Sequence, residues 1–153
     1  MKLPPFQRFV ETHWEDVSRF LRATIGRSDA EDCLQETFLA ALRSYPRLRN
    51  DDNLRGWVLT IAHRKVLDAH RDRGRRAFPV AEIPDRAAPE PPEANPGVWE
   101  AVESLPPKQR AAVALRYVLD LSHREIARIM GGSEEAARSN VHEGVKRLRK
   151  EKG

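Results

Sequence analysis

The sequence has little cysteine and no long apolar run. Cys33 is the single cysteine, so neither an intrachain disulfide nor a cysteine-built zinc site can form. No stretch approaches the roughly 18 to 20 consecutive apolar residues of a membrane-spanning helix, and no apolar signal segment follows Met1. We therefore expect a cytoplasmic protein that is not inserted into a membrane.

Signals of an active site are also missing. The histidines are scattered along the chain without a ligand cluster, and neither a glycine-rich phosphate loop nor a nucleophile motif occurs. We expect no enzyme activity, no cofactor and no metal. The alternation of apolar and polar residues that is typical of β-strands is absent too, which predicts an all-α protein.

Positive charge is present but unevenly distributed. The 153 residues carry a net charge of +4, yet residues 55–76 alone carry +5 and residues 134–153 carry +2. Residues 77–97 carry −3 and hold six of the eleven prolines, which is typical of an extended linker. Its reach, about 25 to 65 Å, would keep two anion-binding surfaces apart. The predicted domains are residues 1–76 and 98–153.

Three helices are predicted in the first domain. Helical spacing of apolar residues begins at Phe6 and ends at Gly26. Ser28 and Glu31 have the form of a capping box that opens a second helix, which Pro46 stops.

The third predicted helix runs from about residue 53 to about residue 73 and is rich in arginine. Arg64, Arg71 and Arg75 follow one face at spacings of seven and four residues. Arginines along a helix can hold phosphates, and the alternative is a solvated face. Trp57, on the same side, is expected to belong to the core.

The predicted second helix carries an acidic face. Asp29, Asp32 and Glu36 share one side of it, with Gln35 beside them. A metal-dependent nuclease is one alternative, but no histidine completes a ligand set, and a solvated helix face rarely dehydrates a hard cation. A surface that docks a basic partner fits better, with a merely solvated face as the other alternative. Cys33 is expected to be small core filling.

Four helices are predicted in the second domain. A short helix over residues 98–105 is followed by one that Pro107 opens. Ser122 and Glu125 form a second capping box, which opens the third helix of this domain.

The last two predicted helices have the pattern of a helix-turn-helix. Gly131 and Gly132 break one helix, and Ser133 is placed to cap the next. Apolar residues would hold this last helix against the core and leave a face that can donate to base edges and phosphates. The alternative is an ordinary helical hairpin. The predicted outward residues are Glu135, Arg138, Ser139, His142 and Lys146.

In this order, and around a proline-rich linker, these motifs resemble a bacterial RNA polymerase sigma factor of the extracytoplasmic-function (ECF) group. The likeness to region 2.2 lies in DAEDCLQETFLAALRSY, and that to regions 2.3 and 2.4 in NLRGWVLTIAHRKVLDAHRDRGRR. The opening of region 4 resembles ESLPPKQRAAVALRYVLDLSHREIARIMGG. The resemblance covers nearly the whole chain and implies a three-helix region 2-like domain and a four-helix region 4-like domain.

The resemblance implies a transcription initiation factor that binds core RNA polymerase, reads the minus-ten and minus-thirty-five promoter boxes and assists strand opening. Its implied partners are promoter DNA, the clamp coiled coil of the largest polymerase subunit, the flap of the second largest, and an anti-sigma factor. The implied polymerase-binding residues are Asp29, Asp32, Gln35 and Glu36. The implied minus-ten contacts are Leu48, Arg49, Asn50, Asn53, His63, Arg64, Arg71 and Arg75. The implied minus-thirty-five contacts are Ser122, Arg138, Ser139, Asn140, His142 and Lys146.

The chain departs from the family pattern at several positions. Arg64 stands where the family often has Asn, and Asn140 and Glu143 replace two basic residues of the usual last helix. Fewer basic residues should lower the affinity for phosphate and its salt dependence. Gly144 costs about 1 kcal/mol against alanine in a helix interior. The resemblance therefore does not specify which promoter sequences the chain recognises.

The rival interpretation is a stand-alone helix-turn-helix transcriptional regulator. Such a protein acts without polymerase and usually binds a palindromic duplex as a dimer. The acidic second helix argues against this rival, because a stand-alone regulator does not need a surface that docks on polymerase.

Overall fold

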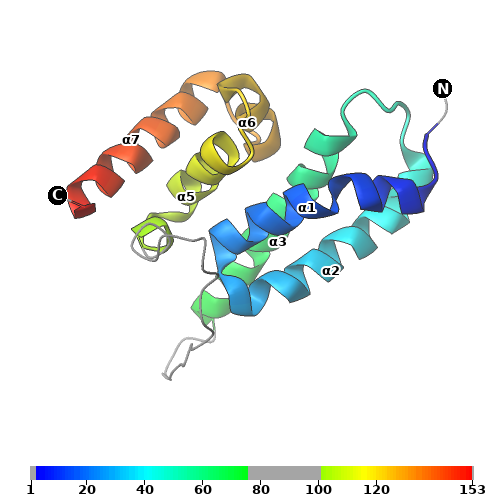
Figure 1. Cartoon of the computed structure of the whole chain (residues 1–153), viewed down its shortest axis with the longest axis horizontal. Coiled ribbons are helices and arrows are strands. Elements are labelled where there is room, and N and C mark those ends of the chain that lie inside the picture. Colours follow the sequence, from blue (N-terminus) through cyan, green and yellow to red (C-terminus); the bar gives the residue numbers. More distant parts are fainter. Residues whose placement is uncertain (1–2, 76–100, 153) are drawn as a thin grey trace.

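The computed structural model describes residues 3–75 and 101–152. All regular elements within these ranges are helical, which confirms the predicted all-α class (Figure 1). The predicted linker, residues 77–97, lies outside the described residues. None of the described helices has the length and apolar character needed to cross a membrane.

The first half, residues 3–75, contains three α-helices and one 3-10 turn. Gly26 separates the first two helices and has a φ of 89°, which costs a glycine little. The capping box predicted at Ser28 is wrong, because α2 already begins at Arg27 with Gly26 as its N-cap. Pro46 does end the second helix as predicted. The elements are α1 Phe6–Ile25, α2 Arg27–Ser44, η1 Tyr45–Arg47 and α3 Leu54–Arg75.

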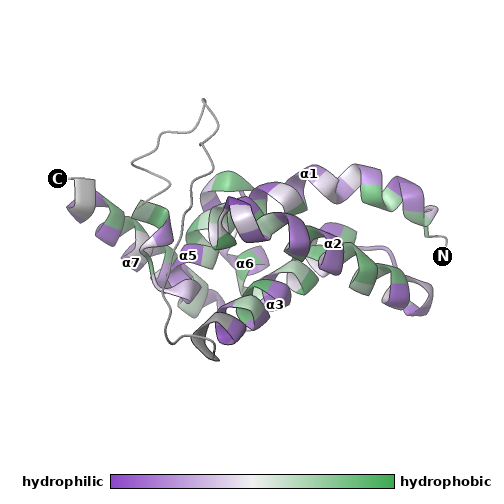
Figure 2. Ribbon diagram, turned by 90° about the horizontal axis from the view of Figure 1, so that it is seen from below, coloured by the Kyte–Doolittle hydropathy of each residue, from purple (hydrophilic) through white to green (hydrophobic). Residues whose placement is uncertain are grey.

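The three α-helices of the first half pack around an apolar core. Val17 and Phe20 of α1, Ala41 of α2, and Val58 and Ala62 of α3 have no exposed surface. Each helix is amphipathic, so hydrophilic and hydrophobic residues alternate along it in Figure 2. The apolar core therefore forms from the residues that helical spacing places on one face of each helix.

An aromatic cluster closes one end of this core. The ring centroid of Trp57 lies 5.6 Å from that of Phe9 and 6.3 Å from that of Tyr45. Trp57 therefore packs against the core, as predicted. Cys33 is buried as well, which confirms its assignment as core filling.

The second half, residues 101–152, ends in a helix-turn-helix. Residues 101–103 are helical, and the next helix begins at Pro107. This helix continues into the π-helical turn η2, where the Leu119 N–H donates to the Ala114 carbonyl at 3.3 Å. The elements are α5 Pro107–Val113, η2 Ala114–Val118, α6 His123–Met130 and α7 Glu134–Lys152.

Side-chain caps define the helix-turn-helix. The Ser122 hydroxyl accepts from the Glu125 N–H at 3.1 Å, and the Glu125 carboxylate accepts from the Ser122 N–H at 2.9 Å. Gly131 ends α6 with a φ of 78°. The Ser133 hydroxyl then accepts from the Ala136 N–H at 3.0 Å at the start of α7. The predicted capping box and the predicted Ser133 cap are both confirmed.

Gly144 lies where α7 packs against α5. A Cβ at this position would come within 2.6 Å of Val113 Cγ2 and 3.5 Å of the Gln109 carbonyl oxygen. The glycine therefore allows the two helices to approach closely, which offsets its unfavourable helix propensity.

The two halves pack against each other, whereas the linker was expected to keep their charged surfaces apart. α6 contacts α3, and η2 contacts α1. Leu59 of α3 and Leu121, which precedes α6, are 0% and 3% exposed and belong to one common apolar core. In Figure 1 the second half lies along one side of α1 and α3.

Candidate functional site

The acidic face predicted on α2 lies on the molecular surface. Asp32, Gln35 and Glu36 are exposed, and Asp29 in the first turn is half-buried. A carboxylate in the first turn is favourable, because it faces the positive end of the helix dipole. Within residues 3–75 and 101–152, no group of three His, Cys, Asp or Glu side chains is arranged to hold a metal ion.

Two leucines extend the acidic face of α2. Leu39 and Leu42 are 52% and 48% exposed, and they follow Asp32 at seven and ten residues, which places them on the same side of the helix. Trp14 of α1 is 44% exposed and stacks on Phe38, with ring centroids 5.3 Å apart. Leu39 and Leu42 are three residues apart, so they form an exposed apolar pair beside the carboxylates. None of these three residues was among the site residues predicted from the sequence.

Cys33 lies beneath the acidic face. Burial raises the pKa of its thiol to about 11, and the charges of Glu36, Asp29 and Asp32 act in the same direction. The thiol is therefore protonated at neutral pH and unreactive. This environment fits core filling and no redox role.

The loop before α3 holds four of the predicted minus-ten contacts. Leu48 packs against the core edge, whereas Arg49, Asn50 and Asn53 are exposed. Asn50 accepts a main-chain N–H two residues further on at 3.1 Å. The Asn53 side chain accepts the main-chain N–H of the residue three positions later at 3.0 Å, and so it caps α3. The two asparagines shape the loop, and Arg49 offers its guanidinium to solvent.

The arginine face of α3 is also on the surface. Arg64 and Arg71 are exposed, and Arg71 pairs with Asp68 at 3.3 Å. Both partners of this pair are more than half exposed, so it contributes little to stability. The side chain of Arg75 lies outside the described part of the chain.

His63 does not belong to this surface. Its side chain is 5% exposed, and its ring centroid lies 6.5 Å from that of Phe20 in α1. Burial, and then the charge of Arg64, lowers its pKa, so the imidazole is neutral at neutral pH. His63 was predicted to contact minus-ten DNA, and the structure places its side chain beneath α1, apart from the exposed arginine face.

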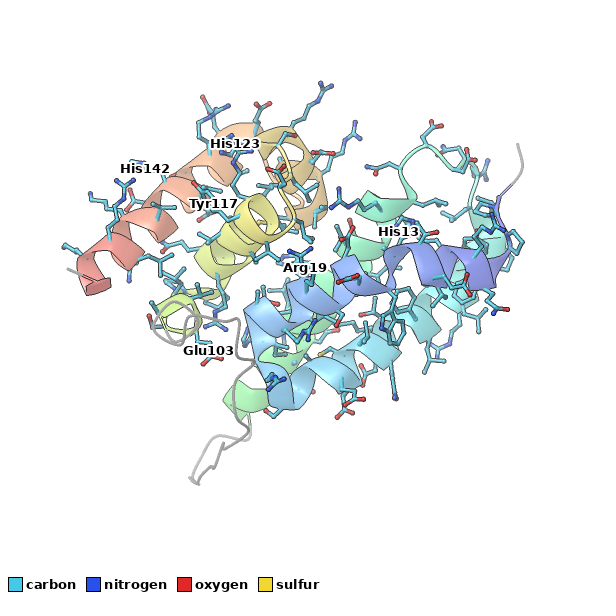
Figure 3. All side chains as sticks on the ribbon, viewed as in Figure 1. His13, Arg19, Glu103, Tyr117, His123 and His142 are labelled. Carbon is cyan, nitrogen blue, oxygen red and sulfur yellow. The ribbon has the colours of Figure 1, made fainter. Side chains whose placement is uncertain are left out.

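The described outer face of α7 is mostly polar and has no large exposed apolar side chain. Arg138, Ser139, His142 and Lys146 are exposed, and Asn140 is half-buried. Figure 3 shows His142 on α7 and His123 at the start of α6.

Two of the predicted minus-thirty-five contacts already have partners in the structure. Arg138 donates to the Glu134 carboxylate one turn earlier at 3.1 Å, in an exposed pair that a phosphate can displace. Ser122, another predicted contact, is exposed, but its hydroxyl caps α6.

Two protein-family models match the chain. Sigma-70 region 2 matches residues 9–76, and Sigma-70 region 4 matches residues 97–148. The helical half with the acidic α2 and the half with the helix-turn-helix thus correspond to two separate family regions. A protein that joins these regions is a sigma factor.

Sequence identity to known sigma factors shows to which group of sigma factors the chain belongs. The chain is 35% identical over 157 residues to the ECF RNA polymerase sigma factor SigD of Mycobacterium tuberculosis, covering 93% of this chain and 74% of that protein. It is 32% identical over 154 residues to the RNA polymerase sigma factor CarQ of Myxococcus xanthus, covering 94% and 87%. The chain therefore belongs to the ECF RNA polymerase sigma factors. Members of this family are transcription initiation factors for RNA polymerase and not catalytic enzymes.

The fold agrees with a solved sigma factor. The sigma factor RpoE of Bartonella quintana, in complex with the anti-sigma factor NepR, matches with a TM-score of 0.80 at 22% identity. The match covers 95% of this chain and 94% of RpoE. At this identity the likeness concerns the fold.

Proposed function

We propose that the chain docks on core RNA polymerase through α2, reads the minus-ten box with the first half and reads the minus-thirty-five box with α7. The observation that carries this proposal is the presence of two different surfaces on one chain. α2 exposes carboxylates together with leucines, whereas the described residues of α7 expose polar and charged side chains and no large apolar one.

The face of α2 fits a basic helical partner with apolar side chains, such as the clamp coiled coil of the largest polymerase subunit. Leu39 and Leu42 would form the apolar centre of the contact, and Asp32 and Glu36 its charged rim. Charge pairs at the rim weaken as salt screens them, whereas leucine burial does not. Docking should therefore be only partly sensitive to salt.

The first half would hold opened minus-ten DNA. Arg49, Arg64 and Arg71 expose guanidinium groups that can pair with phosphates. Extruding a non-template base costs a few kcal/mol of unstacking, which contacts to the single strand must offset. With His63 buried, Arg49, Arg64 and Arg71 are the exposed cationic groups of the predicted minus-ten set that can provide these contacts.

The second half would read minus-thirty-five DNA as a duplex. In a helix-turn-helix the first turns of the second helix contact base edges. Arg138 and Ser139 lie there, and Lys146, two turns further on, is placed for a phosphate. Glu143 can accept from a cytosine amino group.

Two further partners belong to this proposal. The second half would contact the flap of the second largest polymerase subunit, as the family resemblance implies. An anti-sigma factor is a candidate inhibitor, because the RpoE structure contains one.

The proposal is tested by promoter binding with and without core polymerase. A promoter fragment is first selected from genomic DNA with the chain and purified core enzyme together. Fluorescence anisotropy then compares this fragment with one whose two boxes are scrambled. We expect specific binding only when chain and core enzyme are both present. Tight, specific binding by the chain alone as a dimer, with no gain from core enzyme, would support the stand-alone regulator instead.

A further inference from the structure

A groove opens in the second half beside the last turns of α7. Its volume is about 460 Å³, which is within the range of sites that bind small molecules. One wall is the segment before α5, and the other wall is α7. The residues that line the groove are Ser104, Leu105, Glu143, Lys146, Arg147 and Lys150.

Backbone hydrogen bonds fix the wall that precedes α5. The N–H groups of Ser104 and Leu105 donate to the carbonyls three residues earlier, both at 3.1 Å. Leu105 is 3% exposed, so its side chain anchors this wall in the second half. The neighbouring Glu103 carboxylate turns toward Gly26 of the first half and is not part of the lining. This wall therefore adds no negative charge to the groove.

Positive charge dominates the α7 side of the groove. Lys146, Arg147 and Lys150 are all exposed. Within residues 3–75 and 101–152 none of the three forms an ion pair, although Glu143 precedes Arg147 by four residues. Cations near the end of a helix also suit the helix dipole. That role does not require them to line one groove, so three unpaired cations are available there for an anionic partner.

The groove does not face the same way as the proposed base-reading side of α7. At about 3.6 residues per turn, Arg147 lies on the opposite side of the helix from Arg138, which precedes it by nine residues. Lys150 is about a third of a turn away from Arg138. Lys146 lies at the border between the two sides and remains the proposed phosphate contact. When Arg138 faces DNA, the groove therefore stays open to a second partner.

The spacing of the charges fits a peptide better than a single phosphate group. From Lys146 to Lys150 the helix rises by roughly 6 Å, so separate carboxylates can pair with the cations in a row. The Glu143 carboxylate repels phosphate but accepts N–H groups, which a peptide backbone supplies. The lining thus matches a segment that carries several carboxylates on a backbone with N–H donors.

We propose that this groove is a docking site for an acidic peptide segment of a regulatory protein, which binds while α7 contacts DNA. The inference rests on the proposed function, because the orientation of α7 on DNA determines which side of the helix stays open. A partner in the groove would stabilise the promoter-bound chain by mass action without displacing the DNA.

The test neutralises the two groove cations that lie farthest from Arg138. Arg147→Gln/Lys150→Gln is compared with Arg64→Gln/Arg71→Gln, which removes the same charge from the arginine face of α3. The probe is fluorescein-labelled octaglutamate, and its affinity for the full chain is measured by anisotropy without DNA or polymerase. We expect the groove variant to bind about fivefold more weakly and the α3 variant less than about twofold, because only the first loses ion pairs to the peptide. Circular dichroism and thermal unfolding check that both variants are folded.

A second measurement distinguishes a protein partner from DNA. Promoter binding is measured with core polymerase over a series of salt concentrations. Loss of two phosphate contacts would lower the slope of log affinity against log salt by about two. We expect the same slope for Arg147→Gln/Lys150→Gln and the unaltered chain.

Several results would overturn the peptide site. One is an unaltered chain that does not bind octaglutamate, and another is a groove variant that binds it normally. Equal losses in the two variants would show that the peptide follows net charge. A salt slope lowered by about two would assign the groove to DNA phosphates instead. Failure of the unaltered chain to bind promoter DNA with core polymerase would overturn the proposed function, whereas the octaglutamate result does not depend on DNA.

Discussion

The charged faces of α2 and α7 differ in what surrounds their charges. On α2 the exposed carboxylates lie beside Leu39 and Leu42, which are about half exposed. On α7 the apolar residues Ala137 and Val141 are buried against the second half, and none of the described residues exposes a large apolar side chain.

This difference indicates two kinds of partner. Protein interfaces combine an apolar centre with a polar rim, whereas DNA interfaces are more polar and strongly charged. α2 therefore has the composition of a protein-docking face and α7 that of a DNA-binding face. A stand-alone DNA-binding regulator would need only the face of α7.

The largest expected effect comes from reversing the charge on α2. Asp32→Lys/Glu36→Lys should abolish binding to core polymerase, because a basic partner would be repelled. The helical content should not change, since both side chains are exposed. Glu11→Lys/Glu15→Lys on α1 makes the same charge change at the same spacing and serves as the control. Equal affinities of the two variants in a polymerase pull-down would show that the acidic face is only solvated.

On α7, base reading and phosphate binding can be separated. With core polymerase present, Arg138→Ala should weaken minus-thirty-five binding by about 1–3 kcal/mol and relax specificity at one base pair. Lys146→Ala should weaken binding to all sequences alike and lower the salt slope by about one. Anisotropy titrations over a series of salt concentrations and single-base variants measure both effects. The same response from the two variants would mean that Arg138 only contacts phosphate.

The buried face of α7 gives a stability prediction. Gly144→Ala should destabilise the chain by about 1–3 kcal/mol, although alanine favours helix, because the new methyl group meets Val113. Removing the opposing methyl groups in Gly144→Ala/Val113→Ala should recover part of this loss. Thermal unfolding measures both variants. A gain in stability from the single change would show that α5 and α7 are not closely packed.

A smaller effect is expected from the apolar part of the α2 face. Leu42→Ser should weaken polymerase binding by about 1 kcal/mol and leave the melting temperature nearly unchanged, because the side chain is half exposed. Leu42→Met keeps the apolar surface and should bind normally. If Leu42→Ser bound polymerase as tightly as the unaltered chain, only the charged side chains of α2 would contribute to docking.

The smallest effect concerns the buried imidazole of His63. Burial lowers its pKa below the ordinary value of 6.5, so the unfolded chain takes up a proton before the folded chain does. The contribution of the neutral His63 side chain to the free energy of unfolding is therefore fully present above about pH 6.5 and decreases as the pH drops below this value. His63→Gln should flatten this dependence in urea unfolding between about pH 7 and 5, and an unchanged pH dependence in this variant would contradict the assignment to His63.

Local signals in the sequence were enough for most of the fold. Ser122 with Glu125, and Ser133 after two glycines, specify helix starts through groups three residues apart, and both starts were predicted correctly. Ser28 and Glu31 show the same pattern, but Gly26 adopts a positive φ and starts α2 earlier. A capping pattern therefore predicts that a helix starts nearby more reliably than it predicts which residue is the first of that helix.

Features that depend on distant contacts were not predicted. The burial of His63 requires knowing that α1 covers that side of α3. Leu39 and Leu42 stood outside the apolar stripe of the second helix, and their spacing from Asp32 was the signal that could have found them. Packing between the halves depends on arginines that cap helix ends about 60 to 100 residues away, a pairing that leaves no local pattern.

Run-off transcription with purified core polymerase tests the central claim most directly. Core enzyme is mixed with the unaltered chain, with Asp32→Lys/Glu36→Lys, or with its Glu11→Lys/Glu15→Lys control, on a pool of genomic promoter fragments. The account predicts transcripts with defined start sites for the unaltered chain and the control, and none for Asp32→Lys/Glu36→Lys. Absence of specific transcripts with the unaltered chain on every fragment, or transcription that persists in Asp32→Lys/Glu36→Lys, would contradict it.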